Sequence, residues 1–309
     1  MKLIIIGNGF DLNHNFKTSF NHFRSYLNKS ENLDNKTLIK NIDELINYKE
    51  NDIQWNQFEE IIGHRMDPTF RFDDKRKNSD IAVLIEQFTE KFHLYITDLV
   101  KNSNDKINEN LVKEFKDVST ILTFNYTPFY LKYLNNDFNS VFHIHGELEE
   151  NNLPLIGYYY SNPLDNPHSL DYSVRYGKRL IHKSALALKQ NEIDLDSVIR
   201  SYNSKWKGKI SEIVIMGFSF GKSDDHIYNI LDEVMISQTK EVNIPSSKAK
   251  NIRIIKFKIY SYNDKESNLL VEKIKGKFSS MNRRVTTNIT GVGFSHLKKE
   301  LITFELKNY

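Results

Sequence analysis

The sequence predicts an α/β fold with a mainly parallel sheet and a large helical insertion after the first strand. Short apolar runs that end at Gly or Asn alternate with longer segments of helical periodicity. The first run, Leu3 to Ile6, is apolar and unbroken, which is typical of a strand buried on both faces. Because strands and helices alternate along the chain, most strands are expected to run parallel.

The segment 20–117 predicts helices only. Thr18 and Ser19 can cap the first of them, which carries apolar residues on one face. Apolar residues repeat at helical spacing over 36–47, 54–64 and 80–102, and a short helix is predicted at 106–116. Such a connection is longer than usual between two strands. Within a single α/β domain at 1–309, we expect either a subdomain that covers the cleft above the first strand or a packing layer.

Strands and helices also alternate in the rest of the chain. Strands are predicted at 119–124, 141–145, 212–216, 251–261 and near 284–289. Helices are predicted at 128–135, 177–190, 192–206, 265–277 and 294–306, with one more that Ser223 or Asp224 caps and that reaches about 236. The stretch 147–178, rich in Asn, Pro and Tyr, predicts a long loop.

Composition excludes several classes of protein. The formal net charge is only +3 for 309 residues, which gives no electrostatic case for a nucleic-acid partner. The absence of cysteine excludes disulfides, thiolate metal sites and cysteine nucleophiles. No apolar run approaches the roughly 20 residues that cross a bilayer, and Met1 leads directly into a predicted strand without a signal peptide. We expect a cytoplasmic protein without a membrane partner.

The turn Gly7-Asn8-Gly9 ends the first strand. Two glycines allow a tight turn and let a ligand approach the backbone closely. A strand, a Gly-x-Gly turn and the N-terminus of a following helix together can hold a phosphate or another anion. Asn13 stands where a complete fingerprint has its third glycine, so a purely structural turn is the alternative.

Polar clusters follow four of the predicted strands, where ligands bind in parallel sheets. The clusters are Gly7 to Asp11, Asn125 to Thr127, His143 to Gly146, and Gly217 to Phe220. Each has a separate structural explanation, such as a helix cap or a turn glycine, but together they predict one binding cleft. Of the two histidines we favour His145, because it stands at the strand end. Trp55 and Glu59, one helical turn apart, either line the cleft or serve packing and surface roles.

The motifs GNGFDL, W-x-x-FE, FNYT, HIHG and GFSFGKSD, in this order, resemble the AbiH abortive-infection family of bacterial anti-phage proteins. The resemblance extends from residue 5 to about 230. More distantly, the arrangement resembles the Rossmann-like, sirtuin-like NAD-binding fold. The chain departs from both, since it lacks the cysteine pairs of sirtuins and has Asn15-Phe16-Lys17-Thr18-Ser19 where AbiH-like sequences have Gly-Leu-Pro-Thr-Ser.

The resemblance implies NAD as ligand or substrate and assigns residue roles. Asn125 falls on the asparagine that positions ribose and water, and His145 falls on the catalytic histidine. Gly217-Phe218-Ser219 matches a Gly-x-Ser turn that contacts the cofactor ribose. The expected cofactor-binding residues are Gly7, Asn8, Gly9, Phe10, Asp11, Thr127, Gly146, Gly217, Ser219 and Asp224. No metal is expected, because His143, His145, Asp224 and Asp225 lack the spacing of a ligand set.

The leading hypothesis is an anti-phage effector that hydrolyses NAD at the nicotinamide–ribose bond. Such a cleavage passes through an oxocarbenium-like state, for which Asn125 can orient a water and His145 can accept its proton. Two alternatives stay open: a nucleotide-binding sensor without turnover, and a metal-dependent nuclease or phosphohydrolase. A phage-derived trigger, a partner defence protein or a homo-oligomer is compatible with each.

Overall fold

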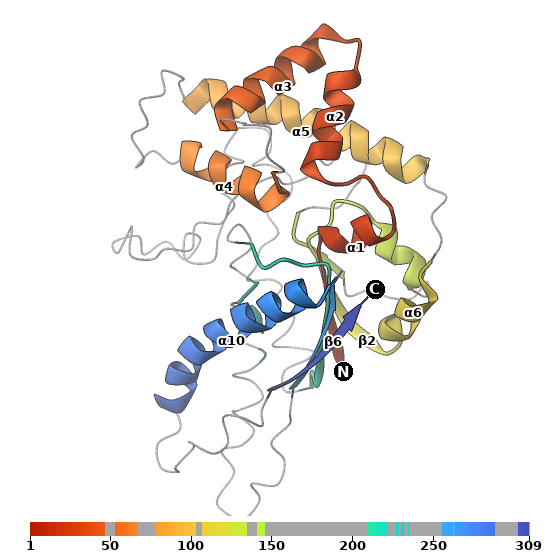
Figure 1. Ribbon diagram of the computed structural model, residues 1–309, viewed down its shortest axis with the longest axis vertical. Helices are drawn as coiled ribbons and strands as arrows, with labels where there is room; N and C mark the ends of the chain where they lie inside the picture. Colours follow the sequence, from red (N-terminus) through yellow and green to blue (C-terminus); the bar gives the residue numbers. More distant parts are fainter. Residues whose placement is uncertain are drawn as a thin grey trace, which may run out of the picture.

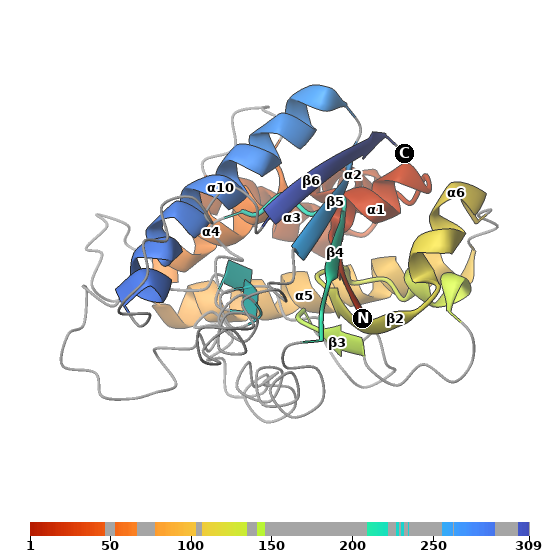
Figure 2. The same ribbon diagram turned by 90° about the horizontal axis from the view of Figure 1, so that it is seen from below.

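A computed structural model describes residues 1–46, 53–66, 78–102, 107–134, 141–145, 209–221, 227–228, 230–231, 234, 255–261, 263–287 and 302–308. Its strands are β1 (Lys2–Ile6), β2 (Val118–Thr123), β3 (Val141–His143), β4 (Glu212–Met216), β5 (Ile255–Ser261) and β6 (Ile302–Asn308). They form one six-stranded sheet in the order β3-β2-β1-β4-β5-β6, and every neighbouring pair is parallel (Figures 1 and 2). This is the strand order of Rossmann-like folds, so the predicted fold class is confirmed.

Strand β1 lies at the centre of the sheet, between β2 and β4. Its residues Leu3 to Ile6 are all at most 1% exposed, as expected for a strand covered on both faces. Side chains alternate between the faces, so that Leu3 and Ile5 belong to one core cluster and Ile4 and Ile6 to another. The apolar run at the start of the chain therefore contributes to the core on both faces of the sheet.

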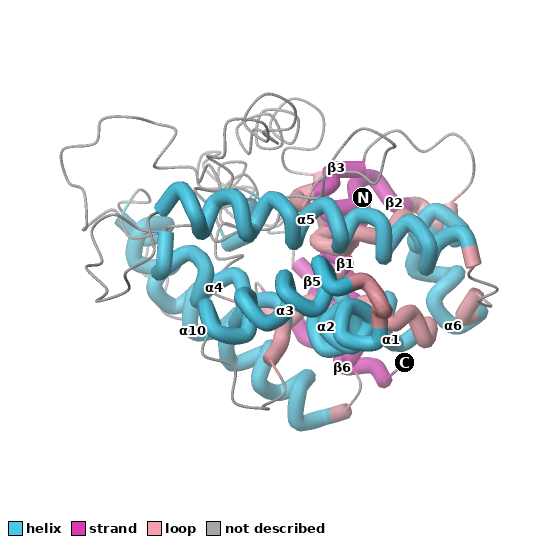
Figure 3. Tube along the Cα trace, turned by 90° about the horizontal axis from the view of Figure 1, so that it is seen from above, coloured by secondary structure: helices cyan, strands magenta, loops and turns pink. Residues whose placement is uncertain are grey.

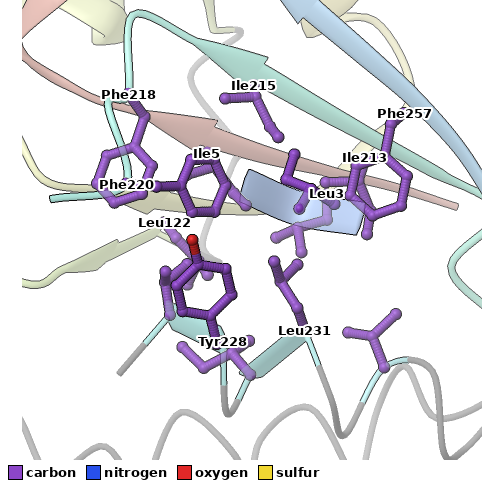
Figure 4. Packing of buried hydrophobic residues seen from close by; sticks show 14 of the residues in the cluster. Leu3, Ile5, Leu122, Ile213, Ile215, Phe218, Phe220, Tyr228, Leu231 and Phe257 are labelled. Atoms are coloured by element: carbon purple, nitrogen blue, oxygen red, sulfur yellow. The ribbon is translucent and has the colours of Figure 1, made fainter. Parts of the chain in front are cut away.

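Each face of the sheet is covered by a different set of elements. On the first face, Leu3, Ile5 and Phe257 share a core cluster with residues of helix α10 (Asp264–Thr287). Figure 4 shows the same cluster with Tyr228 and Leu231 facing these strands. The second face is covered by α1 (Asn8–Asn13), α6 (Glu109–Val112), η1 (Lys113–Phe115) and η2 (Phe129–Tyr133). The sheet is thus the middle layer of three.

The helical insertion has a core of its own. It comprises α2 (Phe20–Lys29), α3 (Leu33–Ile46), α4 (Trp55–Met66) and α5 (Asn78–Lys101). Its packed aromatic rings include Phe20, Phe23, Trp55, Phe58, Phe88 and Phe92. As predicted, Ser19 caps α2, where its hydroxyl accepts a hydrogen bond from the His22 N–H. Figures 1 and 3 show these four helices beyond the carboxyl ends of the strands, on the side of α1.

No helix in the described ranges is both long and apolar enough to cross a membrane.

Several of the predicted elements in the second half of the chain differ from the structure. Helix α10 continues to Thr287 and includes most of the segment predicted as a strand at 284–289. Strand β6 replaces the end of the helix predicted at 294–306, because residues 302–308 pair with β5 along its whole length. The predicted helix at 128–135 is the short 3-10 helix η2. The helices predicted at 177–190 and 192–206 and the loop at 147–178 lie outside the described residues.

The end of β4 is in backbone contact with the start of α1. The Gly7 N–H donates a hydrogen bond to the Met216 carbonyl, and the Gly9 N–H donates one to the Gly217 carbonyl, both at 2.9 Å. Gly217 has a φ of +59°, in the left-handed region, and a Cβ built on it would lie 2.1 Å from the Phe10 nitrogen. Only glycine allows this approach.

We therefore expect Gly217→Ala to lower the free energy of unfolding by about 3 kcal/mol or more, from steric overlap and backbone strain combined. Gly276→Ala is the matched control, because this glycine is in the interior of α10 and a Cβ there meets nothing within 4 Å. The control should stabilise the protein by up to about 1 kcal/mol. Urea unfolding measures both values, and a Gly217→Ala protein as stable as the control would contradict the close contact.

Candidate functional site

The carboxyl ends of three adjacent strands bring together three predicted site residues. Asp11 follows β1 in helix α1, Asn125 comes two residues after β2, and His145 comes two residues after β3. All three are buried, with 1%, 2% and 4% of their surface exposed, respectively. Buried polar groups need hydrogen-bond partners, so the bonds of these side chains define the site.

Asp11 connects α1 to the segment after β2. The Asn125 Nδ2 group donates to one carboxylate oxygen of Asp11 at 2.8 Å, and the Thr127 hydroxyl donates to the other at 2.7 Å. Burial raises the pKa of Asp11 from 3.8 to about 7, because loss of hydration disfavours the charged carboxylate more than the two bonds favour it. Near neutral pH this carboxyl group therefore exchanges a proton.

Asn125 has an unused acceptor. Its amide nitrogen is held by Asp11, and this bond determines how the side chain is oriented. In the part of the chain that the structure describes, its Oδ1 atom is buried without a hydrogen-bond partner. A buried carbonyl without a partner is costly, so this oxygen is suited to accept a hydrogen bond from a water or a ligand hydroxyl.

His145 contacts one residue from the segment after β2 and one from the insertion. Its Nδ1 atom lies 3.1 Å from the Tyr126 hydroxyl and 3.7 Å from Oε1 of Glu59 in helix α4. The Tyr126 hydroxyl also donates to Glu59 Oε1 at 3.2 Å. Glu59 is only 2% exposed, so the insertion supplies a buried carboxylate to the site. Trp55 instead packs in the core of the insertion, and its Nε1 group donates to the Thr18 carbonyl.

The glycine turn bonds mainly to the protein itself. Gly7, Gly9 and Gly217 form the backbone contact between α1 and β4, and the Asn8 Oδ1 atom accepts a bond from the Thr18 hydroxyl at 2.6 Å. Phe10 is buried in the core on the second face of the sheet. These residues place α1 and, with it, Asp11.

The remaining predicted residues are away from this cluster or outside the described ranges. Ser219 is exposed, and its carbonyl accepts a bond from Lys273 at 2.9 Å. Gly146 and Asp224 lie outside the described residues. His143 bonds to the Tyr130 hydroxyl at 2.8 Å, apart from the network of His145. Within the described ranges, no group of three or more His, Asp or Glu residues is arranged to hold a metal ion.

Sequence reasoning did not single out Tyr126 as a site residue. It stands directly after Asn125 in the FNYT motif, and this position is the feature of the sequence that could have identified it as a site residue. Its ring lies 4.9 Å from that of His145, between centroids, and its hydroxyl joins the histidine to Glu59. The arrangement thus combines a histidine held by a carboxylate with a fixed amide that can orient a water, which are the parts of a general-base site.

The titration of Asp11 makes stability depend on pH. The folded chain keeps this proton up to about pH 7, whereas an unfolded chain loses it near pH 3.8. The resulting stabilisation is complete below pH 3.8 and is lost as the pH rises through 7. Over this range the free energy of unfolding falls by up to about 1.4 kcal/mol per pH unit. Asp11→Asn keeps a neutral side chain that can accept from Asn125 and donate to Thr127, so its unfolding free energy should lack this fall.

Urea unfolding between pH 5 and pH 8 compares the wild type with Asp11→Asn. Asp34→Asn, on an exposed position of α3, is the matched control and should follow the wild type. Parallel curves for the wild type and Asp11→Asn would show that Asp11 does not exchange a proton in this range.

Comparison with known proteins agrees with the motifs. The family model described as bacteriophage abortive infection AbiH matches residues 3–77 and 64–244, which together make up more than half of the 309 residues. The matched segments include Asp11, Glu59, Asn125 and His145. A search of curated proteins gives no match. The chain belongs to the AbiH family of bacteriophage abortive-infection proteins.

Proposed function

We propose that this protein is an abortive-infection effector that binds NAD beyond the carboxyl ends of β1, β2 and β3 and hydrolyses it at the nicotinamide–ribose bond. The observation that carries the proposal is the pairing of an unused, buried amide oxygen on Asn125 with a histidine held by a carboxylate. The two groups follow adjacent strands, β2 and β3, of a Rossmann-like sheet. Dinucleotides bind at this edge of such sheets in many proteins, although the fold alone does not define a ligand.

The proposed reaction uses one water. Its oxygen attacks the anomeric carbon of the nicotinamide ribose as the bond to the nicotinamide nitrogen breaks, and the bonding electrons leave with nicotinamide. The positively charged nicotinamide of NAD becomes a neutral leaving group, so the reaction does not need a strong general acid. The products are nicotinamide and ADP-ribose, and the water proton passes to His145.

Each side chain has a defined task in this proposal. Asn125 accepts a hydrogen bond from the water or from a ribose hydroxyl through Oδ1, because Asp11 fixes its Nδ2 group on the other side. His145 accepts the proton of the water in the transition state. Thr127 and Asp11 position the amide without touching the reacting atoms.

The test incubates the purified protein with NAD and measures free nicotinamide by chromatography. Asn125→Ala and His145→Ala should each lower the rate at least 100-fold, within the range of general-base and oriented-group effects. Matched controls are Asn28→Ala and His22→Ala, both on exposed positions of α2, which should stay within twofold of the wild type.

The same four variants are measured in infected bacteria, because an effector can require infection for its activity. Wild type and control cells should lose NAD after infection, whereas cells with Asn125→Ala or His145→Ala should keep it. If NAD binds by calorimetry but is cleaved in neither experiment, the site belongs to a nucleotide sensor. If it is neither bound nor cleaved, NAD is not its ligand.

A further inference from the structure

The hydrogen bonds around His145 have a consistent direction. The Tyr126 hydroxyl has one proton, which it donates to the Glu59 carboxylate. The oxygen of the same hydroxyl lies 3.1 Å from His145 Nδ1, and with its proton already committed it can only accept there. The histidine is therefore the donor, with its proton on Nδ1 and its lone pair on Nε2.

We propose that Glu59, carried by helix α4 of the insertion, is the positioning residue that sets the tautomer of His145 and thereby makes Nε2 its basic atom. This inference rests on the proposed function, since it names the residue that prepares the general base. Glu59 acts through Tyr126 and through its own charge 3.7 Å from Nδ1, which also stabilises the imidazolium formed when a proton is taken up. Among the described residues, the titratable side chains that face Nδ1 of His145 include Glu59 from α4, at 3.7 Å, and Tyr126 after β2, at 3.1 Å.

Helix α4 is fixed by contacts with two separate parts of the protein. Trp55, on the same helix face as Glu59 and one turn before it, donates from Nε1 to the Thr18 carbonyl at 2.7 Å. Asn56 packs on Gly221, after β4, so closely that a Cβ on this glycine would lie 2.7 Å from the Asn56 Cβ. These contacts hold the first turns of α4, and they determine where the Glu59 carboxylate lies.

Burial of Glu59 argues against a purely structural role. A carboxylate that is 2% exposed is expensive to bury, and here the Tyr126 hydroxyl donates to it and His145 lies 3.7 Å from it. If packing were its only task, an apolar residue would fill the same space at lower cost. The position thus uses the charge and the acceptor, which are the properties that orient a histidine.

The decisive measurement reads the His145 tautomer from the nitrogen chemical shifts of the protein labelled at histidine, with His145→Ala to assign the signal. In the wild type the proton should be on Nδ1. In Glu59→Ala the Tyr126 hydroxyl loses the Glu59 carboxylate as acceptor and can donate to Nδ1 instead, so the proton should move to Nε2. Glu59→Gln keeps an amide oxygen as acceptor and should retain a majority of the Nδ1 form.

Kinetics supply the second measurement. Glu59→Ala should lower kcat for nicotinamide release 10- to 100-fold with KM within about threefold, because the residue acts on the base and does not bind NAD. Glu59→Gln should recover part of this loss. Glu90→Gln, on an exposed position of α5, is the matched control and should change neither parameter.

The two measurements separate the two proposals. An unchanged tautomer in Glu59→Ala would overturn the role of Glu59, whether or not NAD is cleaved. The expected change of tautomer without any cleavage of NAD, in the wild type or in infected cells, would leave the positioning role intact and reject the proposed reaction.

A variant outside the network tests the same inference if Glu59→Ala folds poorly. Gly221→Ala places a methyl group against Asn56, which should displace the start of α4 without altering any side chain of the site. We expect a lower fraction of the Nδ1 form and a lower kcat than in Gly276→Ala, the matched glycine control. Wild-type values of both in a folded Gly221→Ala protein would contradict the dependence of His145 on the position of α4.

Discussion

The approach of two backbones, where Gly9 and Phe10 meet Gly217, is the constraint on which the rest of the structure depends. No side chain separates the start of α1 from the end of β4 at this point. Helix α1 can therefore begin directly after β1, and Asp11 comes within reach of Asn125 and Thr127 at the end of β2. A wider separation would move Asp11 away from both donors and leave the Asn125 amide without its anchor.

The site that follows from this constraint consists of two buried polar networks. Asp11, Asn125 and Thr127 form one, and Glu59, Tyr126 and His145 form the other. Asn125 and Tyr126 are consecutive in the chain, so the two networks are joined by a single peptide bond. Polar networks of this kind are stable only when their members are paired, and the Asn125 Oδ1 atom is the member suited to a ligand.

Sequence reasoning was most successful where a local pattern determines the structure. The apolar runs of β1, β2 and β4 and the spacing of apolar residues in α2 to α5 predict these elements to within a few residues. It failed in the last part of the chain, where the apolar residues around Phe304 fit a helix and a strand equally well and pairing with β5 decides. The pairing of Glu59 with His145 could not be predicted, because nothing local indicates which carboxylate of the insertion meets which histidine.

The location of Glu59 in the insertion has a consequence for the order in which the protein can form during translation. The buried residues of the insertion lie between Phe20 and Ile96, so this helical core can assemble early on the ribosome. Asn125 and His145 are synthesised later, and β4, which holds α1 in place, later still. A nascent chain can therefore form the core around Glu59 before His145 has been synthesised, and the complete site exists only once β4 has joined the sheet.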